Sequence, residues 1–140
     1  MNDIIWSESP DEMWLGLCRD VAEQADCTRR EVGAIIVRDG KMVSTGANRI
    51  PKGPGCKSAG ACPRGRFSYG EVCSETSYDR GNGTCFAVHA EAYAIIRASL
   101  ADMIGATIYC TDRPCHNCRL LIVGAGISRI VAPGSVDEIR

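Results

Sequence analysis

The sequence predicts an α/β domain in which helices cover a mixed sheet. Segments with helical periodicity alternate with short apolar runs rich in β-branched residues. The order is helix, strand, strand, loop, helix, strand, helix, strand, which combines an antiparallel hairpin with parallel crossovers. At 140 residues the chain has the length of one packed core, so we expect a single domain over residues 1–140.

The first predicted helix begins at Ser9-Pro10-Asp11-Glu12, where a serine N-cap precedes a proline and a glutamate follows three residues after the cap. Helical spacing then predicts about four turns with a buried stripe of Trp14, Leu17, Cys18, Val21 and Ala25. A strand is expected over residues 32–37. Asp39-Gly40 predicts a tight turn into a second strand over residues 41–45.

Periodicity disappears between about residues 47 and 88, a stretch rich in Gly, Pro and Ser. Loops above about 15 residues are usually functional or held by an additional constraint. After this insert we expect a helix over 89–100, a strand over 106–111, a helix over 115–123 and a strand over 127–131.

Composition narrows the class of protein. The net charge is −1, so the overall balance does not favour polynucleotide binding. No apolar run approaches the ~18 residues of a membrane span, and the N-terminus does not resemble a secretory signal. Nine cysteines is an odd number, which favours thiolates and metal over a disulfide framework. We therefore expect a cytoplasmic protein that does not associate with membranes.

Two short motifs carry the expected chemistry: His89-Ala90-Glu91, and Pro114-Cys115-His116-Asn117-Cys118. Each opens a predicted helix, and Cys115 and Cys118 share one helix face near the positive end of its dipole. One His and two Cys leave a fourth tetrahedral position for water, which is typical of catalytic zinc. Taken alone, Cys115 and Cys118 also fit half of a structural zinc site or a redox pair, and Glu91 also fits a solvated carboxylate at a helix start.

The combined motifs resemble the deoxycytidylate deaminase branch of the cytidine deaminase superfamily. The resemblance extends from about residue 27 to residue 131 and also includes Cys27-Thr28-Arg29-Arg30-Glu31-Val32-Gly33-Ala34, Ser44-Thr45-Gly46-Ala47-Asn48 and Leu121-Ile122-Val123-Gly124-Ala125-Gly126-Ile127. It implies a three-layer cytidine deaminase-like fold, with a mixed sheet of about five strands between helices, assembled into homo-oligomers. A final strand or helix after residue 131 is expected to be missing or rudimentary.

The resemblance implies zinc-dependent hydrolysis of a cytosine nucleotide, dCMP to dUMP and ammonia. His89, Cys115 and Cys118 would hold the zinc, and Glu91 would move protons from the attacking water to ring N3 and the departing amino group. Relatives place a sugar contact at Asn48 and a phosphate contact at Arg29. Ala90 and Tyr93 would also lie at the substrate.

These substrate assignments have ordinary alternatives, since Asn48 also suits a turn and Arg29 a solvated charge. The sequence departs from the branch at Tyr93, where relatives commonly have Asn, and at Arg49, where they commonly have Gly. Both departures leave the preferred nucleotide open. A run of basic residues without an acidic one suits either phosphate or a solvated loop: Lys41, Arg49, Lys52, Lys57, Arg64 and Arg66.

A second, structural zinc is also expected. The resemblance implies Cys27, Cys56, Cys62 and Cys85 as its ligands, with Cys73 as a competitor. A metal would offset the chain entropy of the long loop. The alternative is a set of free or buried thiols.

Three other functions remain open. A deaminase of tRNA or single-stranded DNA shares the zinc motif, but the two Trp, four Tyr and two Phe provide few stacking platforms. A deaminase of a different base or of a free nucleoside is the second. The third is a non-catalytic zinc or nucleotide-binding module, which would not require Glu91.

Overall fold

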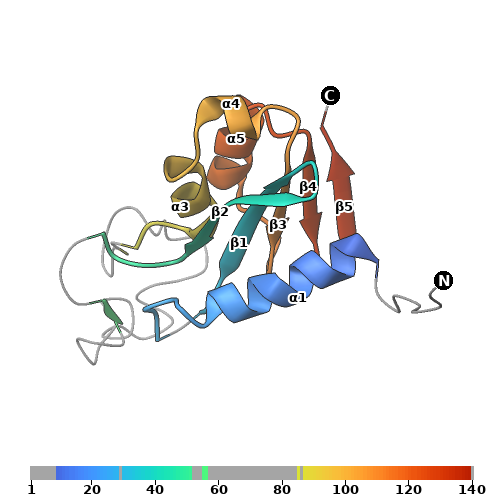
Figure 1. Cartoon of the computed structure of the whole chain (residues 1–140). Coiled ribbons are helices and arrows are strands. Elements are labelled where there is room, and N and C mark those ends of the chain that lie inside the picture. The colour runs from blue at the N-terminus through green and yellow to red at the C-terminus, as the bar shows by residue number, and fades with distance from the viewer. Residues whose placement is uncertain (1–8, 29, 52–54, 57–84, 86, 140) are drawn as a thin grey trace.

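Five strands form one mixed sheet in the order β2-β1-β3-β4-β5 in the computed structural model of the chain (Figure 1). The structure describes residues 9–28, 30–51, 55–56, 85 and 87–139. Strands β3 and β4 are parallel, and the other neighbours are antiparallel. The strands are β1 (Gly33–Arg38), β2 (Lys41–Ala47), β3 (Thr107–Cys110), β4 (Arg129–Ala132) and β5 (Ser135–Glu138). The predicted mixed sheet of about five strands is confirmed.

The β1–β2 hairpin confirms the predicted turn. Asp39 and Gly40 have φ values of 52° and 73°, and both are positive, as a type I′ turn requires. Arg38 pairs with Lys41 across it. Strand β2 continues to Ala47, two residues beyond the expected end.

Helix α1 (Pro10–Ala22) covers one face of the sheet (Figure 1). Its capping box is formed as predicted, with the Glu12 amide donating to the Ser9 hydroxyl at 3.2 Å. Cys18 is buried against Ile35, but the prediction for Leu17 is wrong, because that side chain is 37% exposed. Successive helical residues turn by about 100°, so Leu17 lies beside the stripe centred on Cys18, and Leu15 packs against the core instead.

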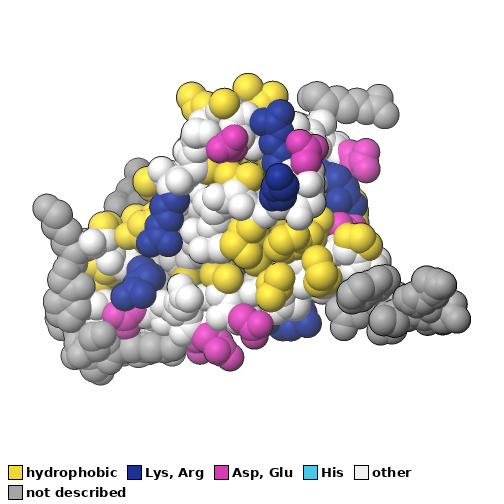
Figure 2. Space-filling view, viewed as in Figure 1, with side chains coloured by type: hydrophobic (Ala, Val, Ile, Leu, Met, Phe, Trp, Pro, Cys, Tyr) yellow, Lys and Arg dark blue, Asp and Glu magenta, His cyan; other side chains and the backbone are white. Residues whose placement is uncertain are grey.

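Helices α3 (Ala90–Ile96), α4 (Leu100–Met103) and α5 (His116–Gly124) cover the opposite face, which completes the three layers (Figure 1). The predicted helix over 89–100 is shorter than expected, because α3 ends at Ile96, and the separate helix α4 begins only at Leu100. The chain breaks because Ser99 caps α4, its hydroxyl accepting from the Asp102 amide at 3.2 Å. Leu100 and Ile104 are 69% and 61% exposed, and hydrophobic side chains gather over α4 in Figure 2.

Two glycines let helices approach the sheet closely. A Cβ atom on Gly46 would lie 2.2 Å from the Ala90 carbonyl oxygen and 2.5 Å from the Ala94 amide nitrogen. A Cβ atom on Gly33 would lie 2.3 Å from the Cys18 carbonyl oxygen. Gly46 therefore sets how deeply the start of α3 sits against β2, and α3 carries three of the predicted site residues: Ala90, Glu91 and Tyr93.

Side-chain hydrogen bonds join the start of α1 to strands β3 and β4. Asp11 accepts from both terminal nitrogens of Arg129, at 3.0 and 2.6 Å, and from the Tyr109 hydroxyl at 2.7 Å. The β5 strand pairs with β4 over four residues, so the final strand is present but short. No helix in the described ranges is long and apolar enough to span a membrane.

Candidate metal centre and substrate cavity

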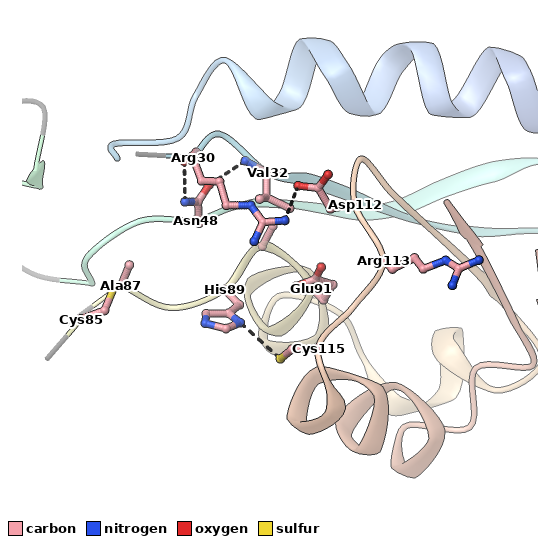
Figure 3. Close-up of a pocket in the computed structure, with 11 residues that line it drawn as sticks. Arg30, Val32, Asn48, Cys85, Ala87, His89, Glu91, Asp112, Arg113 and Cys115 are labelled. Carbon is pink, nitrogen blue, oxygen red and sulfur yellow. Dashed lines mark hydrogen bonds and ion pairs between the residues drawn. The ribbon is translucent and has the colours of Figure 1, made fainter. Parts of the chain in front are cut away.

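The predicted ligands His89, Cys115 and Cys118 come together between α3 and α5. The Nδ1 atom of His89 lies 3.7 Å from Sγ of Cys115 and 3.3 Å from Sγ of Cys118. All three donor atoms lie within 4.8 Å of one another. Figure 3 shows the side chains of His89 and Cys115 pointing toward each other from these two elements.

The local structure explains why these donors are available. His89 and Cys115 are the N-cap residues of α3 and α5, with extended ψ values of 152° and 169°. Neither side chain makes a capping hydrogen bond, so both are available for a metal. Cys118 lies in the first turn of α5 and is buried. The helix was expected to begin at Cys115, but it begins at His116, because Cys115 takes the extended cap conformation.

The electrostatics of the cluster favour a cation. Burial raises the pKa of the Cys118 thiol, and the nearby Glu91 carboxylate and Cys115 raise that pKa further. A divalent cation between the three donors would reverse this balance and favour the thiolate. Donors of a tetrahedral zinc site with bonds of about 2.0 to 2.3 Å lie roughly 3.5 to 3.8 Å apart, close to the observed separations.

Glu91 lies in the first turn of α3, beside the cluster. Glu91 is only 4% exposed, and it lines the same cavity as His89 and Cys115. A buried carboxylate is costly unless a partner or a reaction uses it. The position therefore suits proton transfer to a molecule held in the cavity.

The cavity next to the cluster has a volume of about 200 Å³. Ala90 and Asn48, two of the residues expected to contact substrate, line it together with several others: Arg30, Val32, Cys85, Ala87, Asp112 and Arg113. The Asn48 amide oxygen accepts from the Val32 amide at 2.9 Å, and its amide nitrogen donates to the Arg30 carbonyl at 2.9 Å. Asn48 thus also fixes the backbone of the cavity wall.

An ion pair on this wall was missed by the sequence analysis. Arg30 Nη2 lies 3.1 Å from Asp112 Oδ2, and the side chain of Arg30 reaches toward Asp112 over the cavity in Figure 3. The two residues flank β1 and β3, and only the strand order reveals that they meet. The neighbouring Arg113 guanidinium points away from His89 and Cys115 (Figure 3).

Tyr93 is the remaining predicted substrate residue that the structure describes. The described residues that line the cavity do not include Tyr93, whose ring lies under the Arg97 guanidinium at 5.2 Å. The predicted contact of Tyr93 with substrate gains no support from this position. The Arg49 side chain donates to the Gln24 carbonyl at 3.3 Å. Arg29 and four of the basic residues lie outside the described residues: Lys52, Lys57, Arg64 and Arg66.

The expected second zinc site is described only in part. The Cys56 amide donates to the Asp26 carbonyl at 3.1 Å, which places Cys56 beside the residue before Cys27. Cys85 lines the cavity. These three cysteines do not form a three-donor group like that of His89 within the part of the chain that the structure describes. Cys62 and Cys73 lie outside it.

Comparisons with known proteins agree with this geometry. The profile of the cytidine and deoxycytidylate deaminase zinc-binding region matches residues 8–133. The chain is 44% identical over 124 residues to a protein of Mycobacterium phage D29 named deoxycytidylate deaminase, covering 88% of this chain and 93% of that protein. It is 34% identical over 123 residues to the deoxycytidylate deaminase of Saccharomyces cerevisiae, covering 86% of this chain but 36% of the yeast protein.

Solved structures show the same fold. The dCMP deaminase of cyanophage S-TIM5, in complex with dCMP and dUMP, superposes with a TM-score of 0.62 at 22% identity, covering 91% of this chain and 83% of that one. Cytidine deaminase from Mycobacterium tuberculosis superposes with a TM-score of 0.52 at 18% identity, covering 94% and 91%.

Proposed function

Because the chain belongs to the cytidine and deoxycytidylate deaminase family, we propose that it hydrolyses dCMP to dUMP and ammonia with the help of zinc. The observation that carries this proposal is the position of Glu91, a buried carboxylate beside the His89, Cys115 and Cys118 donors. A metal that only stabilised the fold would not need a carboxylate at the cavity. The phage relative, matched over 93% of its length, supports dCMP as substrate.

The three donors would hold the catalytic zinc. Their nitrogen and sulfur chemistry and their separations fit a tetrahedral site with a fourth position open to the cavity. Zinc, when bound, lowers the pKa of water enough to supply a nucleophile near neutral pH.

Glu91 performs the proton transfers in this proposal. Its carboxylate accepts a proton from the water that attacks C4 of cytosine and delivers that proton to ring N3. Glu91 then accepts the second proton of that water from the hydroxyl formed at C4 and gives it to the amino group, which leaves as ammonia while the C4 carbonyl forms. Glu91 is only 4% exposed and lines the cavity, so its burial limits the contact of these transfers with bulk water.

The cavity wall would orient the nucleotide. Ala90 is the first residue of α3, so its amide belongs to the helix end whose N–H groups lack intrahelical partners. Asn48, already fixed by Arg30 and Val32, retains further amide hydrogen-bonding capacity for the sugar. Arg29 remains our proposal for a phosphate contact on the basis of the sequence alone.

A second zinc, held by Cys27, Cys56, Cys62 and Cys85 with Cys73 as a competitor, belongs to the same proposal. It is supported by Asp26, which brings the start of the insert toward Cys27. The Asp26 carboxylate accepts from the Gly55 amide at 3.0 Å, and the Asp26 carbonyl accepts from the Cys56 amide. Metal analysis of the purified protein tests it, with two zinc ions per chain as the expected result.

We also propose a cytoplasmic homo-oligomer. No disulfide links the described cysteines to one another, which suits a reducing compartment. The exposed Leu100 and Ile104 near α4, with Leu120 and Leu121 on α5, would be covered by self-association. Light scattering coupled to size-exclusion chromatography tests the assembly, and a monomer would contradict it.

The substrate assignment is tested by ammonia release from a panel of compounds. The panel contains dCMP, CMP, deoxycytidine, cytidine, dCTP, adenosine and a cytosine-containing oligonucleotide. We expect the highest kcat/KM with dCMP. If only the oligonucleotide or only adenosine releases ammonia, the zinc-dependent mechanism stands but dCMP is not the substrate.

A further inference from the structure

We infer that Arg30, oriented by Asp112, binds the 5′-phosphate of the substrate and so selects nucleotides over nucleosides. The inference rests on the proposed function, because it concerns the same cavity. Both residues line that cavity, and both side chains are accessible, with exposed fractions of 65% and 42%. Arg29 is the phosphate contact that the family resemblance implies, and no pattern in the sequence points to Arg30 or Asp112.

The sheet brings the two residues to one edge. Strands β1 and β3 are antiparallel neighbours, with Ala34 opposite Cys110. Arg30 precedes β1 and Asp112 follows β3, so they emerge at the same end of adjacent strands. The ion pair of 3.1 Å therefore spans the cavity wall between two separate chain segments.

The backbone under Arg30 is held firmly. The Asn48 side chain accepts from the Val32 amide and donates to the Arg30 carbonyl, both at 2.9 Å. On the opposite strand, the Thr111 hydroxyl accepts from the Gly33 amide at 3.1 Å, and the Thr111 amide donates to the Gly33 carbonyl at 3.0 Å. A residue on such a frame can position a ligand, since little ordering remains to be done upon binding.

Arg30 is the described guanidinium of the wall that is placed to meet an anion in the cavity. Of the described cationic side chains on the wall, Arg113 points away from the metal ligands, whereas Arg30 extends over the cavity (Figure 3). A guanidinium offers five N–H donors, and the ion pair with Asp112 engages one terminal nitrogen. The remaining donors form the planar fork that matches a phosphate group.

Asp112 acts on Arg30 rather than on the substrate. Its carboxylate would repel a phosphate directly, but its ion pair with Arg30 holds the guanidinium across the wall. This places Asp112 as a positioning residue, whose loss weakens nucleotide binding less than the loss of Arg30. Arg119 and Asp137 form a comparable surface ion pair, with exposed fractions of 46% and 40%, and neither residue lines the cavity.

The test compares the product nucleotide with its nucleoside, because binding of a product needs no turnover. Dissociation constants for dUMP and deoxyuridine are measured by calorimetry on the zinc-loaded full chain and on Arg30→Gln, Arg30→Lys, Asp112→Asn and Arg119→Gln. We expect Arg30→Gln to raise the dissociation constant of dUMP by about 10- to 100-fold and to change that of deoxyuridine by no more than about twofold. Arg30→Lys should recover part of the loss, and Arg119→Gln should match the wild type.

Two results would overturn the inference. One is an equal loss of dUMP and deoxyuridine in Arg30→Gln, which would make Arg30 a structural residue. The other is unchanged dUMP binding in that variant. Failure of the proposed function would look different. If the wild-type protein binds dUMP more tightly than deoxyuridine but releases no ammonia from dCMP, the proposed function fails and the inference about Arg30 stands. In the active enzyme, the same variant should raise KM for dCMP with kcat nearly unchanged.

Discussion

The Sγ atom of Cys118 lies 3.3 Å from Nδ1 of His89, although 29 residues separate them in the sequence. The starts of α3 and α5 meet at this point. Each helix contributes donors from its cap or first turn, where backbone N–H groups also carry partial positive charge. The site therefore depends on the packing of two helix starts against one sheet face.

Replacing Cys118 with Ala should remove the catalytic metal. Cys118 is the buried member of the cluster, and two remaining donors bind zinc weakly. We expect less than one catalytic zinc per chain, measured by elemental analysis after dialysis, together with a loss of turnover. Cys110→Ala is the control, because Cys110 is fully buried in the core and its burial raises the pKa of the thiol. That variant should lose stability but keep its zinc, and loss of zinc from both would contradict the assignment.

Gly46→Ala should disturb the site through packing. The added Cβ atom would meet the Ala90 carbonyl oxygen at 2.2 Å, so β2 and α3 must separate. We expect a free energy of unfolding lower by about 1 to 3 kcal/mol, as for overpacked cores, together with reduced turnover. Gly124→Ala provides the comparison, because nothing lies within 4 Å of a Cβ atom there. Equal unfolding midpoints in urea for the two variants would show that the close approach is unimportant.

The Asp11–Arg129 pair should make stability depend on acidic pH. Hydrogen bonds from Arg129 lower the pKa of Asp11 below its ordinary value of 3.8, so the folded protein binds this proton less readily than the unfolded chain. The stabilisation is therefore present above the unfolded pKa and is lost as pH falls through the folded pKa. Asp11→Asn should lower Tm at pH 7, and its difference from wild type should shrink below about pH 4.

Glu138→Gln is the matched control for this experiment. Glu138 lies 3.8 Å from Arg129 and its side chain is 76% exposed, so its contribution should be small at any pH. A constant difference in Tm between Asp11→Asn and wild type from pH 3 to pH 7 would contradict the pH argument.

The sequence alone identified the features that depend on short-range patterns. The α1 capping box, the Asp39-Gly40 turn and the spacing of Cys115 and Cys118 are each set by residues within a few positions of one another. The fold class followed from periodicity, and the family resemblance supplied the expected number of layers and strands.

Features that depend on tertiary neighbours could not be predicted. Arg30 and Asp112 meet because β1 lies next to β3, a strand order that no local pattern specifies. The exposure of Leu17 depends on which part of the α1 stripe the sheet covers. The break before α4 follows from the cap at Ser99, which competes with continuation of α3. The packing of Tyr93 against Arg97 likewise requires the structure.

The most direct test of the central claim is the Glu91→Gln variant, analysed for both zinc content and dCMP turnover. The variant preserves the shape of the buried side chain but removes the carboxylate that moves protons. We expect wild-type zinc content, and ammonia release from dCMP lower by about 100- to 10,000-fold. Turnover near the wild-type rate with zinc bound would contradict the account, because another group would then have to transfer the protons.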